Sequence, residues 1–173
     1  MLAIGRERIV KAVVDTEPLV NALILNYVRA VPANRRSAVL GRSRVSDYLR
    51  DPILRRAFLE LFDSIQTIIT TSHVIGEINR FAPKEGHRES FWRSAVDWLR
   101  KKAFDERLVK LLDTWEAEPW PGLICRIGPV DAGLIKLAKQ EGCHLLTDDG
   151  RTLEPHALHE GVNCKLVARY LSR

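Results

Sequence analysis

The stretch Pro129–Leu153, PVDAGLIKLAKQEGCHLLTDDGRTL, decides the fold of this chain. Pro129 occupies a position that suits the first turn of a helix, and Gly142 one that suits its end, so the stretch predicts a helix between them. The apolar run Cys143–Thr147 follows at once and predicts a buried strand. This strand ends at Asp148-Asp149-Gly150, so two carboxylates come directly after its carboxyl end.

The same unit of strand, acid and helix occurs earlier in the chain. Ile9–Val14 is short, apolar and β-branched, and Asp15 follows it. Gln66–Thr71 is also strand-like, and Ser72 after it can cap a helix. Strands that alternate with helices predict an α/β fold, here a three-layer α/β/α sandwich around a mainly parallel sheet. We expect one domain over residues 1–173, because this length suits one domain and no linker divides it.

The remaining elements are predicted from periodicity and from turn residues. Further helices are expected over Leu19–Val28, Pro52–Ile65, Ser72–Phe81, Glu89–Ala103, Asp105–Trp115 and Thr152–His159, and further strands over Leu123–Ile127 and Cys164–Tyr170. The polar segment Pro32–Ser46 is expected to form a loop or a short helix.

The composition excludes several classes of protein. The chain is 46% hydrophobic and 28% charged, which is typical of a folded domain and not of a disordered chain. Its apolar runs stay well short of the roughly 20 residues of a membrane span, and its N-terminus does not resemble a signal peptide. Three widely spaced cysteines rule out a disulfide scaffold and form no CxxC metal site. We therefore expect a cytoplasmic protein without a membrane partner.

Positive charge is concentrated in one part of the chain. Residues 29–56 hold eight arginines against Asp47 and Asp51, a net charge of +6, whereas the whole chain has +5. Arginine forks onto phosphate oxygens and stacks on bases, so this segment is a candidate contact surface for nucleic acid. The candidate phosphate-binding residues are Arg35, Arg36, Arg42, Arg44 and Arg151. A solvated helical face and a surface for an acidic protein partner are the alternatives.

Five carboxylates follow strand ends or lie in helices that begin there. They are Asp15, Glu77, Asp131, Asp148 and Asp149. Each alone has a structural explanation as a helix cap, a partner of the helix dipole, a turn residue or a surface charge. Together they would meet at the carboxyl edge of a parallel sheet, where ligands bind. Clustered carboxylates repel, and a divalent cation relieves that repulsion; oxygen ligands favour Mg²⁺ or Mn²⁺ over Zn²⁺.

Four stretches of the chain resemble the motifs of PIN-domain ribonucleases, in the order of that family. They are Val13–Val20 (VVDTEPLV), Thr71–Ile78 (TSHVIGEI), Asp131–Ala138 (DAGLIKLA) and Leu145–Asp149 (LLTDD). The resemblance implies catalytic acids at Asp15, Glu77, Asp131 and one or both of Asp148 and Asp149. It implies metal ligands among the four aspartates and supporting hydroxyls at Thr16 and Thr147.

The resemblance also implies a function. Members of this family cleave single-stranded RNA with Mg²⁺ or Mn²⁺, and many bacterial members are toxins that a small antitoxin neutralises. We therefore expect a metal-dependent endoribonuclease, with a toxin role, an antitoxin partner and a homodimer as further expectations. A non-catalytic RNA-binding or protein-interaction module on the same fold is the alternative.

The interval from Asp15 to Glu77 is longer than in the compact toxins of this family. It holds an Arg-rich helical insertion at about residues 29–65. Two roles for this insertion stay open: it binds substrate RNA, or it occupies the surface where an antitoxin would bind.

Overall fold

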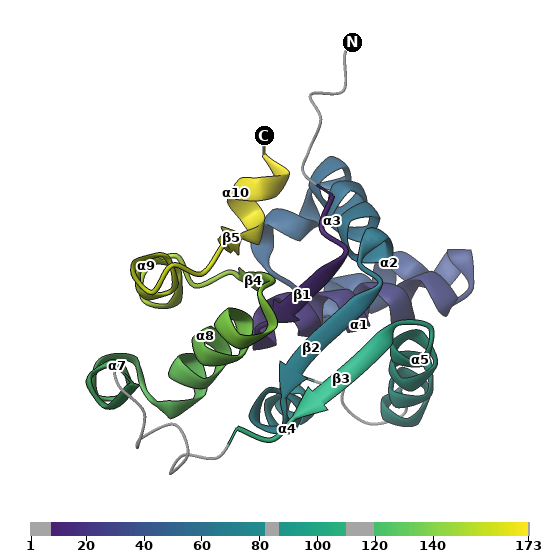
Figure 1. Cartoon of the computed structure of the whole chain (residues 1–173). Coiled ribbons are helices and arrows are strands. Elements are labelled where there is room, and N and C mark those ends of the chain that lie inside the picture. Colours follow the sequence, from purple (N-terminus) through teal and green to yellow (C-terminus); the bar gives the residue numbers. More distant parts are fainter. Residues whose placement is uncertain (1–7, 82–86, 110–119, 173) are drawn as a thin grey trace.

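The protein folds around a five-stranded parallel sheet (Figure 1). The structure, a computed structural model, describes residues 8–81, 87–109 and 120–172, apart from the side chain of Trp120. The strands are β1 (Lys11–Val14), β2 (Thr67–Thr71), β3 (Ala103–Arg107), β4 (His144–Thr147) and β5 (Cys164–Leu166). Their order in the sheet is β3-β2-β1-β4-β5, so β1 lies at the centre. Every strand pairing is parallel, which confirms the predicted α/β class.

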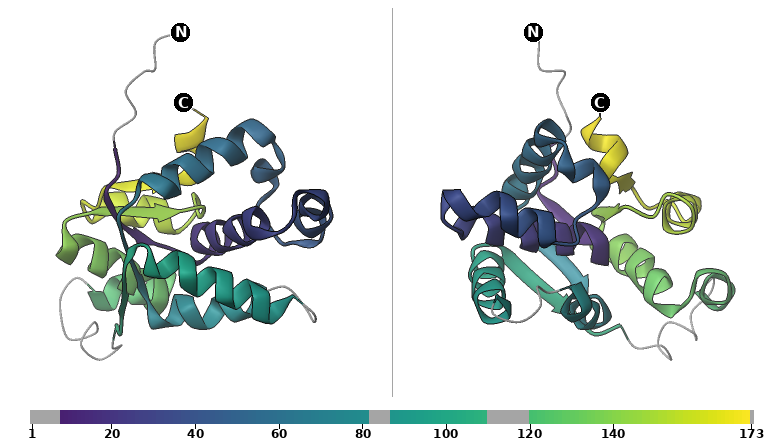
Figure 2. Two further views of the ribbon diagram at one scale, coloured as in Figure 1. Left: turned by 90° about the vertical axis from the view of Figure 1, so that its right-hand side faces the viewer. Right: turned by 180° about the vertical axis from the view of Figure 1, so that it is seen from behind.

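Helices cover both faces of the sheet, as Figure 1 and the view from behind in Figure 2 show. One face carries α1 (Thr16–Ala30), α3 (Pro52–Ser64), α4 (Ser72–Phe81) and α5 (Arg88–Arg100). The other carries α7 (Trp120–Ile127), α8 (Pro129–Glu141) and α9 (Leu153–His159). The short helix α2 (Ala33–Arg42) and the single 3-10 turn η1 (Asp47–Arg50) connect α1 to α3, and α10 (Val167–Leu171) packs against α3. The three predicted layers are therefore present.

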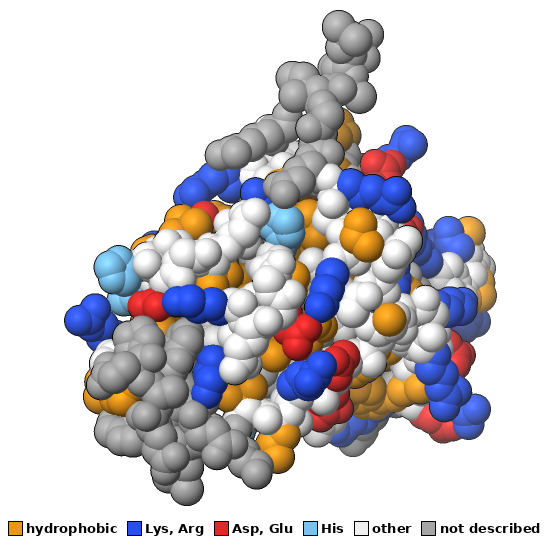
Figure 3. Space-filling view, viewed as in Figure 1, with side chains coloured by type: hydrophobic (Ala, Val, Ile, Leu, Met, Phe, Trp, Pro, Cys, Tyr) orange, Lys and Arg blue, Asp and Glu red, His pale blue; other side chains and the backbone are white. Residues whose placement is uncertain are grey.

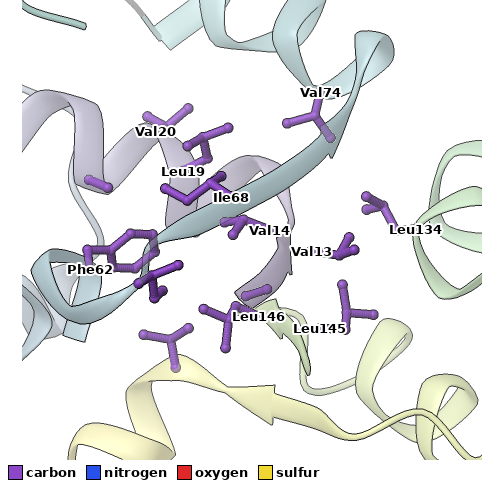
Figure 4. Packing of buried hydrophobic residues seen from close by; sticks show 14 of the residues in the cluster. Val13, Val14, Leu19, Val20, Phe62, Ile68, Val74, Leu134, Leu145 and Leu146 are labelled. Carbon is purple, nitrogen blue, oxygen red and sulfur yellow. The ribbon is translucent and has the colours of Figure 1, made fainter. Parts of the chain in front are cut away.

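Alternate residues of the central strands supply the two halves of the core. Val13 and Leu145 point toward Leu134 of α8, while Val14 and Leu146 point toward the helices of the other face (Figure 4). This follows from the period of two along a strand and from the register, which pairs Val13 with Leu145. All of these side chains are fully buried. The packing fixes β1 and β4 side by side, and thereby the acids that follow them.

Several details of the sequence prediction are confirmed. Pro129 lies in the first turn of α8, and Gly142 ends that helix in the left-handed conformation at φ 58°. Only glycine adopts this conformation without strain. The segment Pro32–Ser46 forms the short helix α2, one of its two predicted alternatives. None of the described helices is long and apolar enough to cross a membrane.

Three elements differ from the prediction. The expected helix Asp105–Trp115 is wrong at its start, because Asp105–Arg107 belong to β3, which pairs in parallel with β2; residues 110–115 lie outside the described part. The charged side chains of Asp105–Arg107 are tolerated in a strand because β3 lies at the edge of the sheet and exposes them to solvent. Leu123–Ile127 belongs to the helix α7 and not to a strand, since a short apolar run does not distinguish the two.

The last predicted strand, Cys164–Tyr170, is correct only in its first three residues. β5 ends at Leu166, and α10 begins at Val167. β4 pairs with β5 only as far as Thr147 opposite Leu166. Beyond that point none of the described strands pairs with the chain, which turns into a helix that buries Val167 and Leu171.

Candidate active site

Asp15 and Thr147 meet at the carboxyl ends of the two central strands. Val14 lies opposite Leu146 in the register, and the backbone N–H of Asp15 donates to the Leu146 carbonyl oxygen at 3.0 Å. The Thr147 hydroxyl then donates to Asp15 Oδ2 at 2.7 Å. The other oxygen of Asp15 accepts the backbone N–H of Thr16 at 2.6 Å, which caps α1. One oxygen of this carboxylate is thus held from the neighbouring strand β4, and the other is held by the start of α1.

Asp149 joins the same site through Thr147. Its backbone N–H donates to the Thr147 hydroxyl oxygen at 2.9 Å. Its Oδ1 accepts the backbone N–H groups of Arg151 and Thr152, each at 2.9 Å. Partial burial acts to raise the pKa of Asp149, but these backbone donors outweigh it and hold the pKa below its ordinary value. Asp149 is therefore ionised at neutral pH.

Glu77 reaches the site from α4, which begins directly after β2. The Thr16 hydroxyl donates to Glu77 Oε2 at 2.7 Å. Since the backbone N–H of Thr16 also holds Asp15, Thr16 links the carboxylates of Asp15 and Glu77, and Thr147 links the carboxylate of Asp15 to the backbone of Asp149. Thr16 and Thr147, predicted as supporting hydroxyls, are therefore placed between the acids.

Asp131 completes the cluster from the first turn of α8. Its pKa is raised to about 6, first by burial and then by the negative charges of Asp15, Asp149 and Glu77, in that order of importance. Burial also raises the pKa of Asp15, against the hydrogen bonds from Thr147 and Thr16, and the charges of Asp149 and Glu77 add to the rise. Burial and the charges of neighbouring carboxylates therefore raise the pKa of two of the four acids of this site, Asp15 and Asp131.

Asp148 points away from this cluster. Its Oδ2 accepts the Tyr48 hydroxyl at 2.8 Å, and its Oδ1 accepts the backbone N–H of Ala168 at 3.3 Å. Burial raises the pKa of Asp148 to about 6, against the hydrogen bond from Tyr48, and the charge of Glu17 adds to the rise. Neighbouring residues of an extended segment face opposite ways, so Asp149 faces Asp15 while Asp148 faces η1.

The donor set fits a hard divalent cation. It consists of carboxylates with threonine hydroxyls beside them, and Mg²⁺ and Mn²⁺ prefer such oxygen ligands. Burial raises the pKa of Asp131 most, and repulsion from the other acids adds to the rise; a bound cation would relieve that repulsion. As the described residues stand, they form no group of three His, Cys, Asp or Glu side chains close enough to hold a metal ion. The charges of these acids act on one another, but their side chains would have to move closer together to bind a metal ion.

The predicted phosphate-binding arginines fall into two groups. Arg36 donates through Nε to the Val31 carbonyl oxygen at 2.9 Å and through Nη2 to that of Arg29 at 2.8 Å, so it caps the end of α1. Within the described part of the chain, no side-chain hydrogen bond or ion pair engages Arg35, Arg42, Arg44 or Arg151. Helix α2, which carries Arg35 and Arg42, lies at the outer edge of the molecule and buries none of its residues (Figure 2). On the face drawn in Figure 3, by contrast, basic and acidic side chains are interspersed.

Tyr48 is the contact that sequence reasoning missed. It lies 100 positions before Asp148 in the chain, in a 3-10 turn that no periodicity predicts. A lone tyrosine among arginines carries no signal of a distant carboxylate partner. Only the position of η1 beside the end of β4 reveals the pair.

The acid cluster lies at the carboxyl edge of a parallel sheet, which is where α/β proteins bind their ligands. The family model described as PIN domain matches residues 38–155, so the chain belongs to the PIN domain family and the predicted resemblance is confirmed. PIN domains are generally nucleases and typically use divalent metal ions. Comparison with curated proteins and with solved structures gave no match. The matched range includes Glu77, Asp131 and Asp149 but begins after Asp15, whose place in the site is given by its bond with Thr147.

Proposed function

We propose that this chain is a metal-dependent endoribonuclease that hydrolyses phosphodiester bonds of single-stranded RNA. The observation that carries the proposal is the cluster of Asp15, Glu77, Asp131 and Asp149, in which burial and then the charges of the other three acids raise the pKa of Asp131. A structural role does not require four repelling carboxylates in one partly buried place. A site that binds a cation and a phosphodiester requires such a group of carboxylates.

Each residue of the cluster has a role in this proposal. Asp15, Asp131 and Asp149 would hold Mg²⁺ or Mn²⁺, directly or through water. The cation supplies a water of lowered pKa and offsets the charge that develops on the phosphate. Glu77, held by the Thr16 hydroxyl, orients the attacking water. The Thr147 hydroxyl keeps Asp15 in its orientation.

The RNA backbone would lie along exposed arginines. Arg35, Arg42 and Arg44 belong to the insertion, and Arg151 follows Asp149 at the mouth of the site. Such contacts position a nucleic acid without reading its sequence. Arg36 has two of its nitrogens committed to the end of α1, so its contribution to RNA binding is the smallest of the set.

The test is cleavage of an end-labelled single-stranded RNA by the pure protein with Mn²⁺. We expect Asp15→Asn and Asp149→Asn to abolish cleavage, since each removes a ligand charge with almost no change in volume. Asp97→Asn, at an exposed carboxylate of α5, is the matched control and keeps full activity. Asp148→Asn keeps activity too, because its carboxylate faces Tyr48. Cleavage that survives EDTA, or an active Asp15→Asn, would refute the metal site.

A non-catalytic RNA-binding module is the alternative function. It predicts that the protein binds the same RNA but never cleaves it, with or without Mn²⁺. The toxin role, an antitoxin partner and a homodimer belong to the proposal only through the family resemblance. Growth arrest on expression of the wild type, but not of Asp15→Asn, tests the toxin role.

A further inference from the structure

A pocket of about 260 Å³ opens beside the acid cluster, between α1, the end of α4 and the segment before η1. Its walls include Glu17, Val20, Asn21, Arg44, Ser46 and Phe81. Pockets for drug-sized ligands span about 300–1,000 Å³, so this one has room for a single planar group and not for a larger molecule. Arg44 is one of the exposed arginines, whereas neither Glu17 nor Phe81 belongs to the acid cluster.

The pocket lies next to the place where a phosphodiester would bind. Glu17 comes two residues after Asp15 in the first turn of α1. Phe81 follows Glu77 by four residues on α4 and therefore lies on the same face of that helix, one turn away. The hydrogen bond between Thr16 and Glu77 joins the two helices at the acid end. One helical turn is about 5.4 Å, a spacing comparable to that between a phosphate and the base of its own nucleotide.

A relay of hydrogen bonds fixes the carboxylate of Glu17 in the pocket wall. Asn21 is only 1% exposed and makes two hydrogen bonds with Ser46. Its Nδ2 donates to the Ser46 hydroxyl oxygen at 2.7 Å, and its Oδ1 accepts the Ser46 backbone N–H at 3.1 Å. The Ser46 hydroxyl in turn donates to Glu17 Oε1 at 2.6 Å. An exposed glutamate is ordinarily free to rotate. Here a buried amide holds it in place, which lowers the entropic cost of binding a ligand.

The three functional groups of the pocket match the edges of one nucleobase. A carboxylate accepts the parallel N1–H and N2–H donors of guanine, and an arginine donates to its O6 and N7 acceptors. Phe81 offers an aromatic face on which a base can stack. Adenine, cytosine and uracil each lack the pair of adjacent donors that a carboxylate accepts, so each could pair with only one oxygen of Glu17.

We propose that this pocket binds a guanine base of single-stranded RNA, with Glu17 and Arg44 reading its edges and Phe81 stacking on it. The proposal rests on the proposed function and adds a substrate preference to it: the nuclease cleaves next to guanine. Glu17, Arg44 and Phe81 are specificity residues, and Ser46 is a positioning residue that acts through Glu17.

Binding and cleavage are measured separately to test this. In EDTA, the wild type is titrated against short fluorescent oligouridylates that carry one central guanine, adenine, cytosine or uracil. We expect the guanine oligomer to bind about tenfold more tightly than the others. With Mn²⁺, the cleavage positions on a mixed-sequence RNA are mapped and are expected to lie next to guanines.

The variants separate base recognition from general binding. Glu17→Gln is expected to remove the guanine preference, because a neutral amide cannot accept both donors. Glu89→Gln, which removes the same charge from the exposed face of α5, keeps the preference. Ser46→Ala weakens the preference without abolishing it, and Phe81→Leu weakens the binding of all four oligomers.

The outcomes distinguish this proposal from the proposed function. Equal binding of all four oligomers, or a preference that Glu17→Gln leaves intact, overturns the guanine pocket, whereas Mn²⁺-dependent cleavage in the same protein leaves the nuclease standing. Guanine-selective binding without any cleavage supports the pocket and refutes the nuclease. Failure to bind any oligomer overturns the pocket.

Discussion

The hydrogen bond from Tyr48 to Asp148 allows a test of how the Arg-rich insertion is tied to the sheet. Tyr48→Phe removes only the hydroxyl, which donates to Asp148 Oδ2 at 2.8 Å. A hydrogen bond to an ionised group contributes about 1.5–3 kcal/mol, so at pH 7.5 we expect the variant to lose about 2 kcal/mol of unfolding free energy. For a chain of this size the melting temperature then falls by about 4–8 °C.

The pH dependence makes this prediction specific. Burial raises the pKa of Asp148 to about 6, above the value of 3.8 in an unfolded chain. The stability that this group contributes is therefore fully present below pH 3.8 and is lost as the pH rises through 6. At pH 5 the folded protein holds Asp148 mostly protonated, and Tyr48→Phe then removes a bond between neutral groups, worth about 1 kcal/mol. The loss of unfolding free energy caused by Tyr48→Phe should accordingly be about twice as large at pH 7.5 as at pH 5.

Urea unfolding followed by tryptophan fluorescence measures the loss of unfolding free energy at pH 7.5 and at pH 5. Tyr27→Phe is the matched control, because its hydroxyl bonds to His87 and not to a carboxylate. In the double variant with Asp148→Asn, the extra loss at pH 7.5 should disappear. A loss for Tyr48→Phe that is equal at the two pH values, or that persists undiminished in the double variant, would refute the reasoning.

Three further predictions concern single side chains and the metal. Lys102 donates to the carbonyl oxygens of Phe62, Asp63 and Ile65 at the end of α3, so Lys102→Met should lower the unfolding free energy by about 1–3 kcal/mol while Lys101→Met leaves it unchanged. Arg35→Gln should reduce the slope of log affinity for single-stranded RNA against log salt by about 0.7 at unchanged stability, whereas Arg36→Gln should lower the melting temperature because it uncaps α1. Because Asp131 has a pKa of about 6, Mn²⁺ should raise the melting temperature more at pH 7.5 than at pH 5, and an equal rise at both pH values, or a rise that Asp131→Asn retains, would contradict its role as a ligand.

The sequence alone was sufficient where the signal is local. The strands β1 and β4 are short apolar runs and β2 is rich in the β-branched residues Ile and Thr, so each could be predicted without knowledge of its neighbours. Pro129 marks the start of α8 because its ring fixes φ near the helical value, and Gly142 marks the end because glycine can adopt the left-handed conformation. The gathering of the acids could be predicted as well, because the ends of parallel strands meet at one edge of the sheet.

Only the tertiary structure decided those features that depend on contact with a segment distant in the sequence. The charged run Asp105–Arg107 is a strand only because β2 offers it a free edge, and Leu123–Ile127 is a helix only because α8 covers its apolar face. The difference between Asp148 and Asp149 arises because Tyr48 lies on one side of the segment and Thr147 on the other.

The pocket beside the acids is another feature that the sequence alone did not predict. Its walls come from three separate segments, at residues 17–21, 44–46 and 81, and no pattern in the sequence indicates that these segments share a surface. The chain determines which strands and helices form, since backbone preference and hydrophobic period act between near neighbours. Which side chains share a surface depends on packing between distant segments, and that is decided only when the whole domain has folded.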